Sequence, residues 1–224
     1  MIQAVLFDCD GLMFETERIS ITMWKREAEK YGVKLPEDFF VHITGSGKGY
    51  TKQYMNSIPG VSEVQGEISK KRFNLDFWKS CAKDTLNKPG LIELFAWLND
   101  HEYKVAICSS SPKIYVETLL GTVSVKLSYN AMITGDMVTR AKPDPEIFLK
   151  GAEVLGVKPE ECLVLEDSKA GILAAHAAGM HSCWIKDMIE ADAEMEQALE
   201  YRRNDLHEVI GLIEEINGGI HGIQ

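Results

Sequence analysis

The side chains best suited to acid–base, nucleophilic or metal chemistry lie in four short segments of this 224-residue chain. They are Asp8, Asp10, Ser109, Ser110, Lys142, Glu166 and Asp167. Carboxylates gathered in one place repel each other unless a cation lies among them, and hard oxygen ligands suit Mg²⁺. A lysine and a hydroxyl can then hold the other oxygens of a phosphate group. If the fold brings the four segments together, they indicate Mg²⁺-assisted phosphoryl transfer.

The two aspartates of the first segment could divide the work of such a transfer. An aspartate is ordinarily ionised at neutral pH, so Asp8 could attack phosphorus without a separate base. Asp10 lies two residues further on, and in an extended strand both side chains point to the same side. Asp10 could therefore protonate the leaving oxygen and later deprotonate the incoming water.

Each segment follows a short apolar run that we predict to be a buried β-strand. The runs cover residues 4–8, 104–108, 131–134 and 162–165, and a fifth lies at 181–185. From residue 90 onward they alternate with predicted helices, which is typical of right-handed βαβ units on a parallel sheet. These helices cover residues 91–98, 112–120, 144–155, 168–178 and 205–216. Because ligands bind beyond the carboxyl ends of such strands, we expect the seven side chains at one sheet edge.

The part of the chain between the first two strands differs in character. Residues 16–31 have apolar side chains at helical spacing, and Gly32 closes that pattern. The chain stays helical or loop-like as far as residue 87 and shows no convincing strand. The strand at 4–8 is not stable alone and must join the later sheet, so residues 15–87 are predicted to form a helical insert in one α/β core.

Each segment taken alone also has a simpler structural explanation. Asp167 and Ser109 could cap helices, and Lys142 before Pro143 could be a solvated loop residue. The occurrence of four such segments in order after four strands favours a shared site.

Composition limits the choice of partner and compartment. A net charge of -10 disfavours nucleic acid and anionic membranes. The five cysteines form no CxxC pair, and most lie in apolar runs, as expected of buried thiols in a reducing compartment. The N-terminal residues do not have the pattern of a secretion signal, and apolar runs are too short to span a membrane. We expect a cytoplasmic protein.

Together, the four segments resemble the motifs of the haloacid dehalogenase-like hydrolase superfamily, in its β-phosphoglucomutase-like branch. The matching residues are 7–17, 107–111, 142–148 and 165–172. The resemblance implies an α/β fold: a Rossmann-like parallel-sheet core with helices on both faces and an inserted α-helical cap. The core would comprise residues 1–14 and 88–224, and the cap, residues 15–87, would close over the site and exclude water.

The resemblance also implies a role for each residue. Asp8 would be the nucleophile and Asp10 the general acid and base. Ser109, Ser110 and Lys142 would bind the phosphoryl group. The cofactor Mg²⁺ would be held by the Asp8 carboxylate, the Asp10 backbone carbonyl and Asp167, with Glu166 in support.

A glycine-rich stretch at 45–49 fails the nucleotide-binding P-loop pattern, because His42 and Gly49 stand where Gly and Ser or Thr are required. We interpret it as a cap loop that faces the site. In the resembling branch this loop supplies a basic residue to the substrate, which here would be Lys48. The alternative is a surface lysine in a turn.

Three functions remain open. The first is a phosphatase that hydrolyses a small phosphorylated metabolite, such as a sugar phosphate, through an aspartyl-phosphate. The second is a phosphosugar mutase, although β-phosphoglucomutases carry a histidine and an arginine where this chain has Ser20 and Lys48. The third, a non-catalytic binding protein, is disfavoured because every catalytic position is filled. Cap-bearing relatives are often monomers, and we expect the same here.

Overall fold

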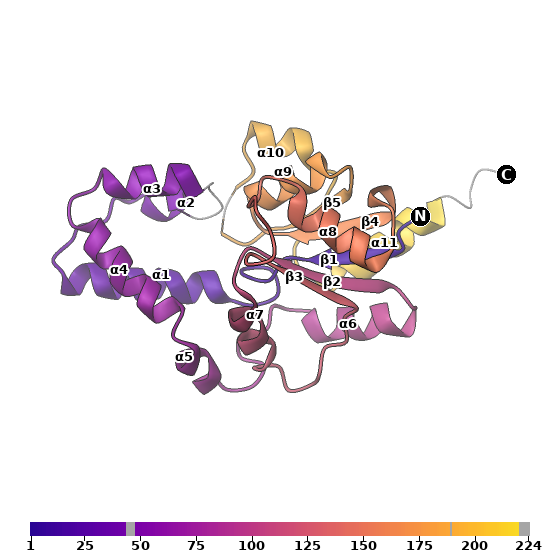
Figure 1. The fold of residues 1–224 in the computed structure, drawn as a ribbon, viewed down its shortest axis with the longest axis horizontal. Coiled ribbons are helices and arrows are strands. Elements are labelled where there is room, and N and C mark those ends of the chain that lie inside the picture. The colour runs from indigo at the N-terminus through magenta and orange to yellow at the C-terminus, as the bar shows by residue number, and fades with distance from the viewer. Residues whose placement is uncertain (44–47, 189, 220–224) are drawn as a thin grey trace.

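A six-stranded sheet forms the centre of the computed structural model, which describes residues 1–43, 48–188 and 190–219. The strand order is β3-β2-β1-β4-β5-β6, and each neighbouring pair is parallel (Figure 1). The strands are β1 (Ala4–Phe7), β2 (Lys104–Ser109), β3 (Ala131–Thr134), β4 (Cys162–Glu166), β5 (His181–Ile185) and β6 (Tyr201–Arg203). The five predicted strands are confirmed. Strand β6 escaped prediction because it is a three-residue, partly exposed edge strand without an apolar run.

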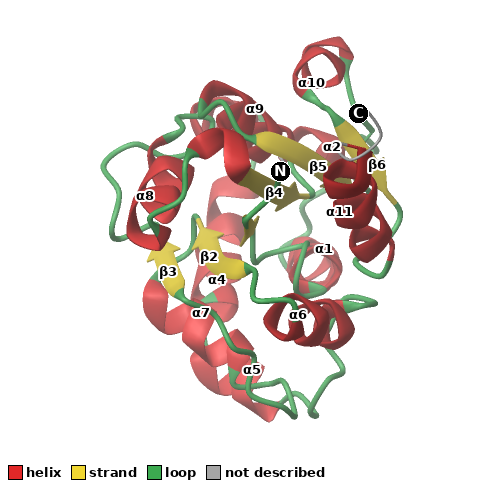
Figure 2. Cartoon of the chain, turned by 90° about the vertical axis from the view of Figure 1, so that its right-hand side faces the viewer, coloured by secondary structure: helices red, strands yellow, loops and turns green. Residues whose placement is uncertain are grey.

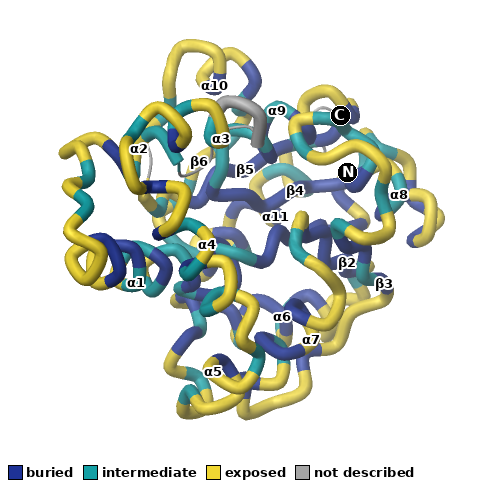
Figure 3. The backbone as a smooth tube through the Cα atoms, turned by 60° about the vertical axis from the view of Figure 1, so that its left-hand side comes forward, coloured by how far each residue is buried: buried dark blue, intermediate teal, exposed yellow. Residues whose placement is uncertain are grey.

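Helices cover both faces of this sheet (Figure 2). They are α6 (Leu91–Asp100), α7 (Lys113–Leu120), α8 (Glu146–Leu155), α9 (Lys169–Ala177), α10 (Ala193–Ala198) and α11 (Glu208–Gly218), with a 3₁₀ turn, η1 (Pro159–Glu161). Successive residues of β1 point to opposite faces: Val5 and Phe7 join the core under α6 and α11, and Leu6 joins the core under α8 and α9. Strands β1 to β5 are therefore largely buried on both sides, whereas the connecting segments are largely exposed (Figure 3). In the described part of the chain, helices fall short of the length and apolar content needed to cross a bilayer.

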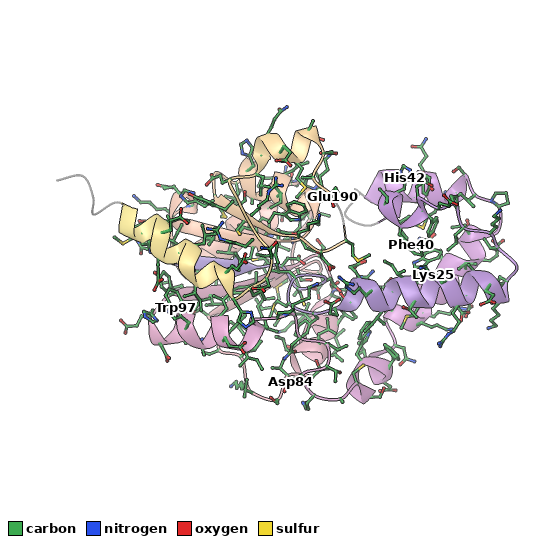
Figure 4. All side chains as sticks on the ribbon, turned by 180° about the vertical axis from the view of Figure 1, so that it is seen from behind. Lys25, Phe40, His42, Asp84, Trp97 and Glu190 are labelled. Atoms are coloured by element: carbon green, nitrogen blue, oxygen red, sulfur yellow. The ribbon has the colours of Figure 1, made fainter. Side chains whose placement is uncertain are left out.

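In the part of the chain that the structure describes, five helices lie between β1 and α6 in the sequence. They are α1 (Thr16–Lys30), α2 (Phe39–Ile43), α3 (Lys48–Asn56), α4 (Val61–Arg72) and α5 (Leu75–Ser80). The first four share their own apolar core, which includes Trp24, Phe39, Met55 and Ile68. On its surface, the ammonium of Lys25 in α1 lies 5.7 Å from the ring centre of Phe40 in α2 (Figure 4). The helical insert, hereafter the cap, is confirmed, and its exact limits at residues 15–87 stay a prediction.

The two chain crossings between sheet and cap lie side by side. Backbone hydrogen bonds run from Glu15 N to Leu86 O at 2.8 Å and from Lys88 N to Met13 O at 2.9 Å. The buried Lys88 ammonium also lies 3.0 Å from Glu15 and 2.8 Å from Asp187, in the loop after β5. Ionic and backbone contacts thus hold the base of the cap against the sheet edge.

The largest stability losses are expected where aromatic packing fills the sheet-side core. Phe95 of α6 is 1% exposed, and its ring centre lies 4.6 Å from that of Phe7. Phe95→Ala should lower the free energy of unfolding by about 3–5 kcal/mol through cavity formation. Leu149→Ala, on the exposed side of α8, is the control and should cost under about 1 kcal/mol. Urea unfolding followed by circular dichroism measures both, and equal losses would contradict this description of the core.

Candidate active site

A cavity of about 760 Å³ lies between the carboxyl ends of the strands and the cap. Its sheet-side lining includes six of the predicted site residues: Asp8, Asp10, Ser109, Ser110, Lys142 and Asp167. Its cap-side lining includes residues of α1 and α4, such as Glu17 and Arg72. Lys48 begins α3, and its side chain lies outside what the structure describes.

The Lys142 ammonium is buried at the centre of the sheet-side residues. Its Nζ atom lies 2.5 Å from Asp8 Oδ1 and 2.6 Å from Glu166 Oε1, and it donates to the Cys108 carbonyl at 3.0 Å. Burial alone would lower the pKa of Lys142, but the charges of Asp8 and Glu166 outweigh burial and raise this pKa. Lys142 is therefore a fixed positive charge beside Asp8.

Glu166 lies behind Lys142 and is fully buried. Its second oxygen, Oε2, accepts hydrogen bonds from Asp167 N at 3.1 Å, Ser168 N at 3.0 Å and Ser168 Oγ at 2.9 Å. A Cβ atom at residue 171 would lie 1.8 Å from Glu166 Oε1, so the glycine there leaves room for this side chain. Glu166 thus orients both Lys142 and the loop that carries Asp167.

A second cation would fit among the carboxylates. Ligand oxygens of Asp8, Glu166 and Asp167 lie within 4.8 Å of one another, and all three residues are buried. Burial raises the pKa of Asp8 to about 7, with Lys142 opposing this rise and Glu166 adding to it. Burial and the charge of Glu166 also raise the pKa of Asp167. The cluster therefore disfavours its own ionised form, and an oxygen-liganded divalent cation such as Mg²⁺ would relieve that penalty.

The turn after β1 brings the backbone close to the same carboxylates. Gly11 has a φ of +80°, and a Cβ atom at this position would lie 2.0 Å from Asp167 Oδ2. Only glycine combines this left-handed conformation with such a close approach. The chain segment that carries Asp10 can therefore pass directly beside Asp167.

The Asp10 carboxylate contacts both the sheet side and the cap. It accepts hydrogen bonds from Ser111 Oγ at 2.7 Å, from Tyr115 OH at 3.1 Å and from Arg72 Nη2 at 3.3 Å. Arg72 also contacts Glu17 Oε1 at 3.1 Å. Sequence reasoning missed Arg72 and Tyr115, because a basic residue in a Lys-rich helix and a tyrosine in an apolar helix carry no distinctive local signal.

Two further residues of α1, Ser20 and Trp24, lie at the cavity. Ser20 is 7% exposed and lines it. Trp24 also lines it while packing edge-on against Phe39, with ring centres 5.1 Å apart. Trp24 thus belongs both to the apolar core of the cap and to the wall of the site.

The fold and the site define an α/β protein with a parallel sheet and a helical cap over carboxylates at the sheet edge. A family model described as haloacid dehalogenase-like hydrolase matches residues 5–185. The chain belongs to this family, so the resemblance inferred from its four motifs is confirmed.

Individual relatives of the chain include a phosphatase and a phosphosugar mutase. It is 30% identical to the phosphorylated carbohydrates phosphatase of Thermotoga maritima, over 80% of this chain and 82% of that protein. It is 28% identical to β-phosphoglucomutase of Bacillus subtilis, over 92% of this chain and 95% of that protein. A haloacid dehalogenase-like protein from Agrobacterium tumefaciens has a similar structure, with a TM-score of 0.79 and 25% sequence identity. The match covers 97% of this chain and 100% of that protein. By contrast, the chain spans only 18% of the Arabidopsis thaliana protein SUPPRESSOR OF QUENCHING 1, to which it is 33% identical.

The buried carboxylates predict an unusual pH dependence for the metal-free protein. Asp8 has a pKa of about 7 when folded, whereas an unfolded aspartate has a pKa of about 3.9. The folded protein therefore binds more protons across this interval, and its free energy of unfolding should fall as pH rises from about 5 to about 8.

Urea unfolding in the presence of a chelator would measure this dependence. Asp8→Asn should weaken it, with the raised pKa of Asp167 supplying the remainder. Mg²⁺ should stabilise the wild type more at pH 8 than at pH 5, because the ionised carboxylates are the ligands. Metal-free protein that is more stable at pH 8 than at pH 5 would refute the electrostatic description of the site.

Proposed function

We propose that this protein is a Mg²⁺-dependent phosphatase that hydrolyses a small phosphomonoester, such as a sugar phosphate, through an aspartyl-phosphate intermediate. The observation that carries the proposal is the position of Asp8, which lines the cavity between the buried Lys142 ammonium and Asp167. Family membership and the 30% identity to a phosphorylated carbohydrates phosphatase support it.

Binding of the phosphate group needs positive charge and hydrogen-bond donors at the sheet edge. In this proposal the Asp8 carboxylate, the Asp10 backbone carbonyl and Asp167 hold Mg²⁺, with Glu166 in support. When bound, Mg²⁺ neutralises charge on the phosphoryl oxygens and so favours attack by an anion. Lys142, Ser109 and Ser110 bind phosphoryl oxygens. The Ser109 oxygen already accepts a hydrogen bond from Ser111 N at 3.1 Å, which leaves its own proton for the phosphate.

The chemistry then proceeds in two displacements. An Asp8 oxygen attacks phosphorus, the bond from phosphorus to the leaving oxygen breaks, and Asp10 donates a proton to that oxygen. Water next attacks the acyl phosphate, Asp10 takes its proton, and inorganic phosphate leaves with Asp8 restored. Asp10 must give up one of its three hydrogen bonds to reach the leaving oxygen. Since Arg72 comes from the cap, a shift of the cap would release one of them.

Phosphosugar mutase activity is the second candidate. The 28% identity to β-phosphoglucomutase over almost the whole chain favours it. In a mutase, a second hydroxyl takes the phosphoryl group in place of water. Ser20 lines the cavity where those mutases carry a histidine, so a group suited to activating a sugar hydroxyl is missing at that position. We therefore propose water as the acceptor.

Loss of the nucleophile should abolish turnover. Asp8→Asn should lower hydrolysis of p-nitrophenyl phosphate by at least about 10³-fold, since an amide cannot form the acyl phosphate. Removal of Mg²⁺ by a chelator should have a similar effect that added Mg²⁺ reverses. Asp76→Asn, on the exposed surface of α5, serves as the control and should keep full activity. Normal turnover by Asp8→Asn would exclude the mechanism.

The fate of the phosphoryl group separates the two candidates. The enzyme is given β-glucose 1-phosphate with a trace of β-glucose 1,6-bisphosphate, and both inorganic phosphate and glucose 6-phosphate are measured over time. We expect phosphate release to outpace isomer formation, because the site lacks the histidine of the mutases. Isomer formation faster than phosphate release would establish a mutase.

A further inference from the structure

The cap end of the cavity offers a substrate mostly uncharged surface. Apolar and neutral polar side chains dominate its described lining: Ser20, Trp24, Ile43, Met55, Gln65, Ile68 and Ser69. Such a wall suits a small molecule with C–H groups on one side and hydroxyls on the other. The part of the substrate beyond its phosphate would rest here.

The charged residues at this end form one compact group. Arg72 is the cation of the described cap-side lining, and its Nη2 atom contacts Glu17 Oε1 at 3.1 Å and Asp10 Oδ1 at 3.3 Å. One positive charge thus faces two carboxylates. A second phosphate or a carboxylate on the substrate would find Arg72 already neutralised and would approach Glu17, a like charge.

Glu17 nevertheless offers a place for a hydroxyl. It lines the cavity, and its side chain is 18% exposed. Oε1 accepts the hydrogen bond from Arg72, and within residues 1–43, 48–188 and 190–219 Oε2 has no hydrogen-bond partner. A substrate hydroxyl can donate to this oxygen, whereas a carboxylate or phosphate dianion cannot.

We propose that Glu17, held by Arg72, selects monophosphates whose remaining part is uncharged and hydroxylated, and rejects substrates that carry a second anionic group. The inference rests on the proposed phosphatase function and adds the residue that sets its substrate class. Rejection comes from the charge of Glu17 and from its neutralisation of Arg72, so selectivity depends on an unfavourable contact as well as on favourable ones.

Two compounds of matched size test the proposal. Glycerol 3-phosphate and 3-phosphoglycerate differ at the far carbon, which carries a hydroxyl in the first and a carboxylate in the second. Each is measured as a competitor of p-nitrophenyl phosphate hydrolysis in Mg²⁺. This assay gives an inhibition constant whether or not the compound is turned over.

The decisive variant is Glu17→Gln, which keeps the shape of the side chain and removes its charge. The matched control is Glu27→Gln: Glu27 also lies on α1 and forms an ion pair with Lys71 of α4, one residue before Arg72, but it lies away from the cavity lining. Both variants therefore weaken an ion pair between the same two helices, and Glu17→Gln alone changes the charge of the site.

We expect the wild type to bind glycerol 3-phosphate at least about tenfold more tightly than 3-phosphoglycerate, since like charges brought together are costly. Glu17→Gln should reduce this ratio at least about fivefold, mainly through tighter binding of 3-phosphoglycerate, because the like charge is removed and Arg72 then faces Asp10 alone. Glu27→Gln should leave the ratio within about twofold of the wild type. Thermal unfolding of both variants checks their folding, and Glu17→Ser provides a second uncharged side chain.

The outcomes separate this inference from the function on which it rests. Absence of p-nitrophenyl phosphate hydrolysis in the wild type would reject the phosphatase function itself. If the wild type hydrolyses p-nitrophenyl phosphate but binds 3-phosphoglycerate as tightly as glycerol 3-phosphate or more tightly, for instance through Lys48, the selectivity alone is rejected. Failure of both compounds to compete, or the same change of ratio in both variants, would likewise overturn the role of Glu17.

Discussion

The Lys142 ammonium, held between Asp8 and Glu166 inside the protein, is the interaction on which the rest of the site depends. Two buried carboxylates would repel each other strongly without this cation. They meet because β1 and β4 are parallel neighbours in which Phe7 pairs with Leu165, so the next residues of both strands lie side by side. Lys142 reaches them from the loop after β3. The proposed metal and phosphate sites are both built upon this buried ion cluster.

The cap enters the chemistry through Asp10 rather than through Asp8. Ser111 and Tyr115 hold the Asp10 carboxylate from the sheet side, and Arg72 holds it from the last turn of α4. The position of the cap and the hydrogen bonding of the proposed general acid are therefore linked. The same arginine contacts Glu17, so one ion-pair group connects proton transfer to the surface that would select the substrate.

The sequence predicted the sheet and its functional edge well, because buried parallel strands are short apolar runs and the residues that end them are strongly polar. Asp8, Ser109, Lys142 and Asp167 could be found in this way, and the structure brings them to one cavity. The sequence could not predict Arg72, Tyr115 or Glu17 as neighbours of the site. The positions of Arg72 and Glu17 depend on how the cap folds over the sheet, and that of Tyr115 depends on how α7 packs in the core. Neither helical periodicity nor charge specifies that packing.

By itself, then, the sequence determined which segments follow strands and meet at one sheet edge, and the kind of chemistry they support, since residue type and strand polarity are local properties. Only the tertiary structure decided that Glu166 holds Lys142 from behind and that Glu17 neutralises Arg72. It also decided that Gly11 and Gly171 leave space for the Asp167 and Glu166 carboxylates. Apart from that of Gly171 with Glu166, these contacts join residues far apart in the chain. Only the packing of the sheet core and of the cap helices α1 and α4 creates them.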